Sequence, residues 1–208
     1  DRYLMEKFNG YKKAHPKIKD SEQIIIGVIK DINKERPVFS IYQMQGSDNK
    51  NLIWLPYGLT YRLLNSKEEI PSETEFLKMQ NKIWKQFNFF KSYSSHEIAS
   101  KSLTISDIPS IYSDVLIGSG NFIFMNYNNK ENAFYYFNKA LKINPQNSKA
   151  YVGLAVYYAS KNDCNMVKKV LEKSIELNPM EAMNYNLLYL NNKNCLKDKA
   201  ETEKVLKL

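Results

Sequence analysis

Cysteine and histidine are scarce in this chain of 208 residues, with two of each. We predict that Cys164 and Cys195 are free thiols, because two cysteines are too few for a disulfide scaffold and both fall where helices are expected. A disulfide between them would need Cα atoms within about 7 Å of each other. His15 and His96 have no second ligand at metal-binding spacing, so the sequence predicts no metal site.

Long apolar runs are also missing. No run approaches the roughly 20 residues that a membrane-spanning helix needs, and the run Ile24-Ile25-Ile26 is broken at once by Gly27. A hydrophobic content of 43% excludes disorder as the dominant state. Residue 1 is Asp and no leader sequence follows it, so we expect either a processed end or the boundary of a piece of a longer chain.

Sequence signals of catalysis are missing as well. The segment Gly118-Ser119-Gly120-Asn121 lacks the Gly-Lys-Ser/Thr of a phosphate loop and falls inside an expected helix. Neither cysteine has a histidine nearby in sequence, and acidic runs such as Glu68-Glu69 fit helix starts or solvated surface. We therefore predict a protein that is not an enzyme, with no catalytic residue and no cofactor.

Positive charge is abundant but consists almost entirely of lysine. The formal net charge is +8, and Arg2, Arg36 and Arg62 are the arginines, although arginine is the residue that binds phosphate in a bidentate manner. The abundance of Asn, Ile, Tyr and Phe points to AT-rich codons, which explains the lysine excess through genome composition. The alternative is a basic module that contacts nucleic acid or an anionic membrane surface through Lys12, Lys13, Lys17 and Lys19.

The first half of the sequence predicts a small sheet with flanking helices. Three runs rich in β-branched and aromatic residues are expected to be strands: Gln23–Ile32, Pro37–Gln45 and Asn51–Tyr57. Helices are expected at Tyr3–Ala14 and Ser72–Lys91.

The second of these helices has a clear start. Ser72 and Glu75 have the spacing of a capping box. Its apolar stripe is expected to pack on the sheet, with a role in partner binding as the alternative, and consists of Phe76, Met79, Ile83, Phe87 and Phe90.

A serine-rich stretch from Ser92 to Pro109 divides the sequence. We predict an α+β protein in which residues 1–107 form a mixed α/β domain and residues 108–208 form an all-α domain.

The second half repeats itself. Asn144-Pro145 and Asn178-Pro179 are 34 residues apart, and the eight residues that end at each proline match. Residues 112–208 resemble the tetratricopeptide repeat (TPR) family in this period and in the K-A-L-x-L-x-P ending. The first repeat places either Gly120 or Asn121 at the family's small position.

The resemblance implies helical hairpins. Their helices are expected at 112–126, 131–143, 148–160 and 165–177, with turns near Asn128 and Asn162. A degenerate third hairpin is expected to begin at Ala182, and the lysine-rich helix Leu196–Leu208 would cap the stack.

TPR arrays hold a peptide or helix of another protein in a groove lined by the first helix of each hairpin. The resemblance places these residues in that groove: Val115, Phe122, Met125, Asn126, Lys149, Val152, Val156, Ser160, Met183, Asn186 and Leu190. The lining is mainly apolar, which favours a hydrophobic or amphipathic partner segment. In the alternative interpretation the groove is filled by this chain's own first domain or by the helix Leu196–Leu208.

The predicted function is therefore a protein-protein interaction adaptor or scaffold. The partner is another protein, with no small-molecule substrate, and nucleic acid is not favoured. The composition and the missing natural start fit a bacterial cell-envelope protein, periplasmic or attached to the membrane through a removed leader or anchor, although a cytoplasmic location stays open.

Overall fold

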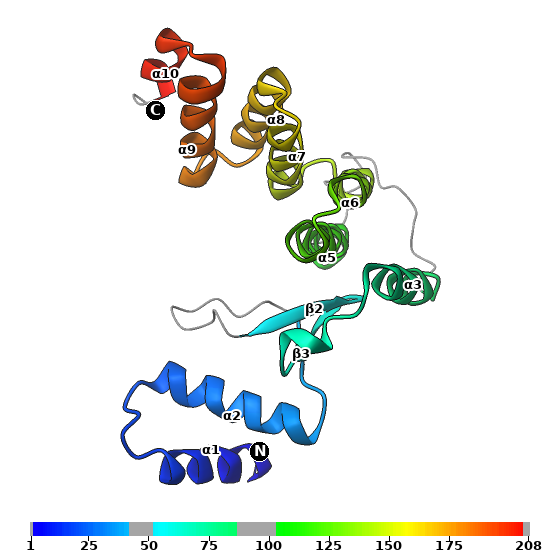
Figure 1. Cartoon of the computed structure of the whole chain (residues 1–208), viewed down its shortest axis with the longest axis vertical. Coiled ribbons are helices and arrows are strands. Elements are labelled where there is room, and N and C mark those ends of the chain that lie inside the picture. The colour runs from blue at the N-terminus through cyan, green and yellow to red at the C-terminus, as the bar shows by residue number, and fades with distance from the viewer. Residues whose placement is uncertain (1, 42–51, 87–102, 206–208) are drawn as a thin grey trace. The chain divides into compact units, whose positions relative to one another are not determined.

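The computed structural model describes residues 2–41, 52–86 and 103–205, and residues 103–107 by their backbone alone. The chain combines helices with a small antiparallel sheet, in agreement with the α+β class (Figure 1). It divides into two compact units, residues 1–86 and 87–208. Each unit is described by itself.

The first unit begins with two helices that pack against each other, α1 (Arg2–Ala14) and α2 (Ser21–Glu35) (Figure 1). The prediction of a helix at Tyr3–Ala14 is confirmed, whereas the predicted strand Gln23–Ile32 is wrong because these residues belong to α2.

The start and the buried face of α2 explain its helical state. Asp20 caps the helix by accepting the backbone N–H of Glu22 at 2.7 Å. Ile24, Val28 and Ile32 recur every four residues and are buried against α1 residues that include Phe8 and Tyr11. Burial of this stripe outweighs the β-branched preference of the three consecutive isoleucines.

The sheet has the strand order β1-β3-β2, with antiparallel pairing throughout. Strand β1 is Phe39–Ser40, β2 is Ile53–Tyr57 and β3 is Thr60–Leu64. The predicted strand Asn51–Tyr57 is confirmed by β2, and β1 lies within the predicted strand Pro37–Gln45, whose residues 42–45 lie outside the described residues. The prediction missed β3, which follows β2 through a tight turn with Gly58 at φ 62°.

Beyond the short helix η2 (Lys67–Glu69), α3 runs over Glu73–Trp84. Ser72 and Glu75 form the predicted capping box, which is confirmed. Of the predicted stripe, Phe76 is fully buried, Met79 and Ile83 are half-buried, and Phe87 and Phe90 lie outside the described residues.

Two polar contacts complete the buried face of α3. The fully buried Gln80 donates its side-chain amide to the Pro56 carbonyl at 2.6 Å, and accepts the Trp84 indole N–H at 3.0 Å. The first bond joins α3 to β2, and the second lies within α3, whose buried residues are Phe76, Gln80 and Trp84.

The second unit is helical in its described part. Its main helices are α5 (Leu103–Tyr127), α6 (Lys130–Ile143), α7 (Ser148–Ser160), α8 (Cys164–Leu177) and α9 (Ala182–Asn191). Consecutive helices pack against each other (Figure 1). The predicted helices at 112–126, 131–143, 148–160 and 165–177 are all present.

Two details of this unit differ from the sequence interpretation or extend it. Helix α5 begins at Leu103, within the stretch expected to separate the domains, and contains Pro109. The predicted turns are confirmed: Asn128 and Asn162 adopt the left-handed conformation with φ of 51° and 58°.

The chain ends in an irregular pair of helices. Helix α9 continues into a π-helical turn (Asn192–Leu196) and, after Lys197 at φ 56°, into α10 (Lys199–Val205). The predicted helix Leu196–Leu208 is therefore shorter, and residues 206–208 lie outside the described residues.

Candidate functional site: the exposed face of the first helices

Three helices of the second unit meet at Phe137 of α6, whose side chain is 1% exposed. A Cβ atom placed on Gly120 of α5 would lie 2.6 Å from the Phe137 ring, and one placed on Gly153 of α7 would also lie 2.6 Å from it. The backbones of α5 and α7 therefore both touch this ring. Gly120, rather than the exposed Asn121, supplies the small position in α5.

Polar side chains also connect α5 to the loop between α6 and α7. Asn144 donates its side-chain amide to the Ser110 hydroxyl at 3.2 Å, and Asn147 donates to the Ser113 hydroxyl at 3.0 Å. Ser113 in turn donates to the Ala140 carbonyl at 3.2 Å. Each Asn–Ser pair is separated by 34 residues, the period of the sequence repeat. These bonds fix the register of α5 against the following helix pair.

The predicted groove residues occupy the first helix of each pair, but their accessibility differs. Val115 and Phe122 are buried, at 3% and 6% exposed, while Val152 and Ser160 are half-buried. The remaining seven are exposed: Met125, Asn126, Lys149, Val156, Met183, Asn186 and Leu190.

Four of the exposed residues are large and apolar. Their exposed fractions are 82% for Met125, 39% for Val156, 59% for Met183 and 42% for Leu190. They come from α5, α7 and α9, the first helices of successive pairs, and α5 and α7 contact each other. We refer to these four residues as the A-helix surface, where an A-helix is the first helix of a pair.

The polar groups beside the A-helix surface are already engaged. Lys149 forms an ion pair with Asp114, with an Nζ to Oδ2 distance of 3.2 Å. Asn126 donates its amide to the Phe122 carbonyl at 2.9 Å. Because the lysine charge is balanced by a carboxylate, these two side chains offer no free charge for a charged ligand.

The outer side of the α6–α7 contact carries an aromatic cluster that the sequence analysis missed. The rings of Phe134 and Tyr157 are 4.3 Å apart, and Glu131 accepts a hydrogen bond from the Tyr157 hydroxyl at 3.0 Å. Glu131 also pairs with Lys161 at 2.7 Å, and these two partners lower the pKa of its carboxyl group. Since the cluster joins two neighbouring helices, its role is to hold α6 and α7 together.

The two cysteines are joined. Cys164, the first residue of α8, forms a disulfide with Cys195 in the π-helical turn, with a Cα–Cα distance of 5.8 Å. The prediction of free thiols is therefore wrong. Cys164 is half-buried and Cys195 is exposed. No sequence signal indicated that the turn after α9 folds back onto α8. Asn191 adds to this junction by donating to the Cys164 carbonyl at 3.0 Å.

The alternative basic site is also exposed. Its lysines lie at the end of α1 and in the loop that follows, and all are exposed: Lys12, Lys13, Lys17 and Lys19. Within the described residues, no group of three or more His, Cys, Asp or Glu side chains is placed to hold a metal ion. In the same part of the chain, no helix has both the length and the apolar character needed to cross a bilayer.

Comparisons of this chain with protein-family models, with curated proteins and with solved structures find no match.

Proposed function

We propose that the second unit is a TPR-like protein-binding module and that the chain acts as a non-enzymatic adaptor or scaffold. Its A-helix surface would hold a hydrophobic or amphipathic segment of a partner protein. The observation that carries this proposal is the position of the four exposed apolar side chains, which come from the first helices of successive pairs.

The chemistry of the surface favours an apolar partner. Met125 and Met183 are among the most exposed large hydrophobic residues of the described part of the chain, and flexible methionine side chains adapt to binding partners of different shape. Lys149 is already paired with Asp114, so a terminal carboxylate would have to compete with Asp114 for it. An amphipathic helix that places its apolar face on this surface fits these properties.

The disulfide supports an extracytoplasmic location. Disulfides persist in oxidising compartments and are rare in the cytosol of most organisms. Together with an amino-acid composition that AT-rich codons favour, the Cys164–Cys195 bond favours a bacterial envelope protein.

Photo-crosslinking tests the proposed surface. A benzophenone amino acid placed at Val156 or Met183 should crosslink to the partner in the native extract. The matched control is the same group at Lys169, which is exposed on α8, a second helix. Crosslinks from Val156 and Met183 but not from Lys169 are expected.

Substitutions then distinguish the two candidate surfaces. The double variant Val156→Glu, Met183→Glu should lose the crosslinked partner in a pull-down while keeping its helical circular dichroism, because both side chains are exposed. Truncation of anchor residues at an interface centre commonly weakens binding by 2 kcal/mol or more. If Lys12→Glu, Lys13→Glu loses the partner and the apolar variant keeps it, the basic alternative replaces this proposal.

A further inference from the structure

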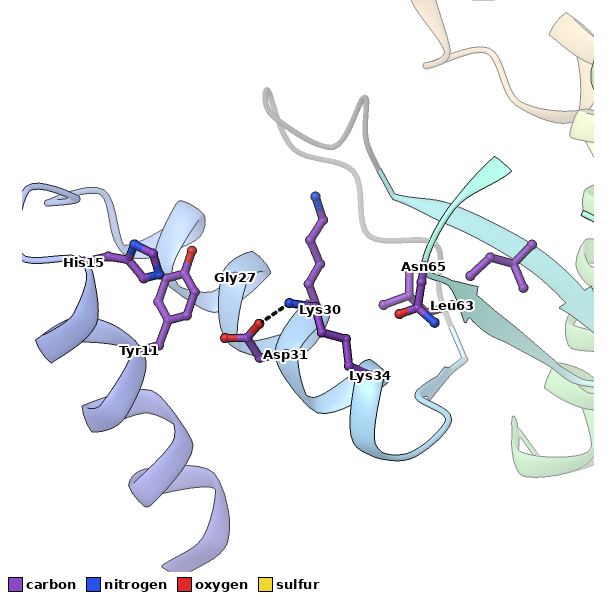
Figure 2. A pocket seen from close by; sticks show the side chains of 9 residues that line it. Tyr11, His15, Gly27, Lys30, Asp31, Lys34, Leu63 and Asn65 are labelled. Atoms are coloured by element: carbon purple, nitrogen blue, oxygen red, sulfur yellow. Dashed lines mark hydrogen bonds and ion pairs between the residues drawn. The ribbon is translucent and has the colours of Figure 1, made fainter. Parts of the chain in front are cut away.

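A cavity of about 310 Å³ lies over α2 in the first unit (Figure 2). Tyr11 and His15, from the end of α1, lie on one side of α2, and Leu63 and Asn65 at the end of β3 lie on the other. The floor is the helix itself, where Gly27, Lys30 and Lys34 recur every three to four residues. The volume is at the lower end of the range for small-molecule sites.

The aromatic side of the cavity is held firmly. A Cβ atom at Gly27 would lie 2.0 Å from the Tyr11 ring, so this ring rests directly on the backbone of α2. The Tyr11 and His15 rings lie 4.3 Å apart in a tilted arrangement. These contacts present an aromatic wall to any ligand in the cavity.

The charged groups of the cavity are two lysines and one carboxylate. Lys34 Nζ forms an ion pair with Asp31 Oδ1 at 2.8 Å (Figure 2). The Lys30 ammonium, in contrast, has no hydrogen bond or ion pair with any described residue. Both polar atoms of the Asn65 side-chain amide are already hydrogen-bonded. The oxygen accepts from Asn33 at 2.8 Å, and the nitrogen donates to Glu69 at 3.0 Å. The group free to bind a ligand is therefore the Lys30 ammonium.

We propose that this cavity binds a small phosphate monoester. Its phosphate would contact Lys30 and draw Lys34 away from Asp31, and its planar or apolar part would lie against Tyr11 and His15. A phosphate monoester is favoured over a carboxylate because it carries a charge of about −1.5 to −2 near pH 7 and so competes better with Asp31 for Lys34.

The same chemistry occurs in a soluble metabolite and in a lipid headgroup. The loop after α1 carries two further exposed lysines, Lys17 and Lys19, within four residues of His15 in the sequence, so a headgroup at a membrane surface is as compatible as a free ligand. Two arms of the experiment separate these sources: calorimetric titration of the full chain with phenyl phosphate, and co-sedimentation with phosphatidylcholine vesicles that do or do not contain phosphatidic acid.

Three single substitutions test the assignment by titration with phenyl phosphate. Lys30→Gln should weaken binding about tenfold or more, because a hydrogen bond to a charged group is lost. Asp31→Asn should tighten binding, because Lys34 is released from its ion pair. Lys13→Gln is the matched control, an exposed lysine at the end of α1 that does not line the cavity, and should change little. Circular dichroism checks that each variant is folded.

Several outcomes would overturn the proposal. One is an undetectable interaction with phenyl phosphate up to about 10 mM, combined with equal sedimentation on both kinds of vesicle. Another is an equal loss of binding in Lys13→Gln and Lys30→Gln, which would reveal general attraction to a basic protein. Equal affinity for inorganic phosphate and phenyl phosphate would remove the role given to Tyr11 and His15.

Discussion

At the scale of single residues, the second unit depends on small side chains at close contacts. Phe137 lies against the backbones of α5 and α7 because Gly120 and Gly153 have no Cβ atom. Glycine inside a helix is usually unfavourable by about 0.5–1 kcal/mol relative to alanine. Its use at both positions therefore indicates that the close approach to the ring stabilises the unit more than alanine would.

Alanine substitutions at two helical glycines should have opposite effects. Gly153→Ala would place a methyl group 2.6 Å from the buried Phe137 ring and should destabilise the protein by about 1–3 kcal/mol. Gly10→Ala in α1, where nothing lies within 4 Å, should stabilise it by about 0.5–1 kcal/mol. Thermal unfolding followed by circular dichroism measures both.

A second substitution controls for the mechanism. If the clash with the ring is the cause, Phe137→Leu combined with Gly153→Ala should destabilise less than the sum of the two single substitutions, because the two sites are in contact. A Gly153→Ala protein as stable as the parent would contradict the close contact between α7 and this ring.

At the scale of elements, the sequence predicted some helices and missed others for identifiable reasons. The run Ile24-Ile25-Ile26 has strong β preference and was interpreted as a strand, yet it belongs to α2. The signals that favour a helix were present, in the Asp20 cap and in the four-residue spacing of Ile24, Val28 and Ile32. Tertiary burial against α1 decided the outcome, and a local pattern cannot show it.

The C-terminal elements were also only partly predictable from local sequence patterns. Helix α9 ends at Asn191, and a π-helical turn begins at Asn192. The side-chain nitrogen and oxygen of Asn192 are buried and have no hydrogen-bond partner among the described residues, which is unfavourable by about 1–3 kcal/mol. The disulfide joins Cys195 of this turn to Cys164 at the start of α8 and so keeps the turn against α8.

Loss of the disulfide should therefore loosen the last helix pair. The two cysteines are 31 residues apart in sequence, and closing a loop of this length stabilises a folded protein by about 3–4 kcal/mol in the chain-entropy model. Cys164→Ser, Cys195→Ser should lower the free energy of unfolding, and hydrogen exchange should increase first in α9 and α10. Urea unfolding combined with exchange mass spectrometry measures both effects.

A dithiol reductant provides the control for this prediction. Reduction should move the unfolding midpoint of the parent protein towards that of the double serine variant and leave the variant itself unchanged. A parent protein that is insensitive to the reductant, although alkylation shows that its thiols have become free, would contradict a stabilising role for the bond.

At the scale of the whole molecule, the second unit was more predictable than the first. The 34-residue recurrence appears twice, so the ends of its helices could be aligned with each other, and the turns at Asn128 and Asn162 followed. The first unit has no recurrence, and β3 was missed although Gly58 marked its turn.

The candidate site was predictable only in part. The alignment placed all of its residues on first helices, but it could not show that Val115 and Phe122 are buried while Met125 is open to solvent. The cavity over α2 was not predictable at all, because it combines residues from α1, α2 and β3, and α2 itself had been interpreted as a strand.

Each unit contains its own buried side chains, which leads to a prediction about the whole chain. The first unit buries Ile24, Val28 and Ile32 against α1, and the second buries Phe137 among α5, α6 and α7. Lys91 and Lys101 lie at and within the serine-rich region expected from the sequence to separate the domains, so we predict that trypsin cuts first at these residues, because cleavage inside a packed helix requires local unfolding. Brief digestion should therefore yield two resistant fragments that separate on gel filtration and unfold in separate transitions. Fragments that stay together and unfold in one transition would show that the units share an interface, and the interpretation in which the first domain fills the groove would then replace the open A-helix surface.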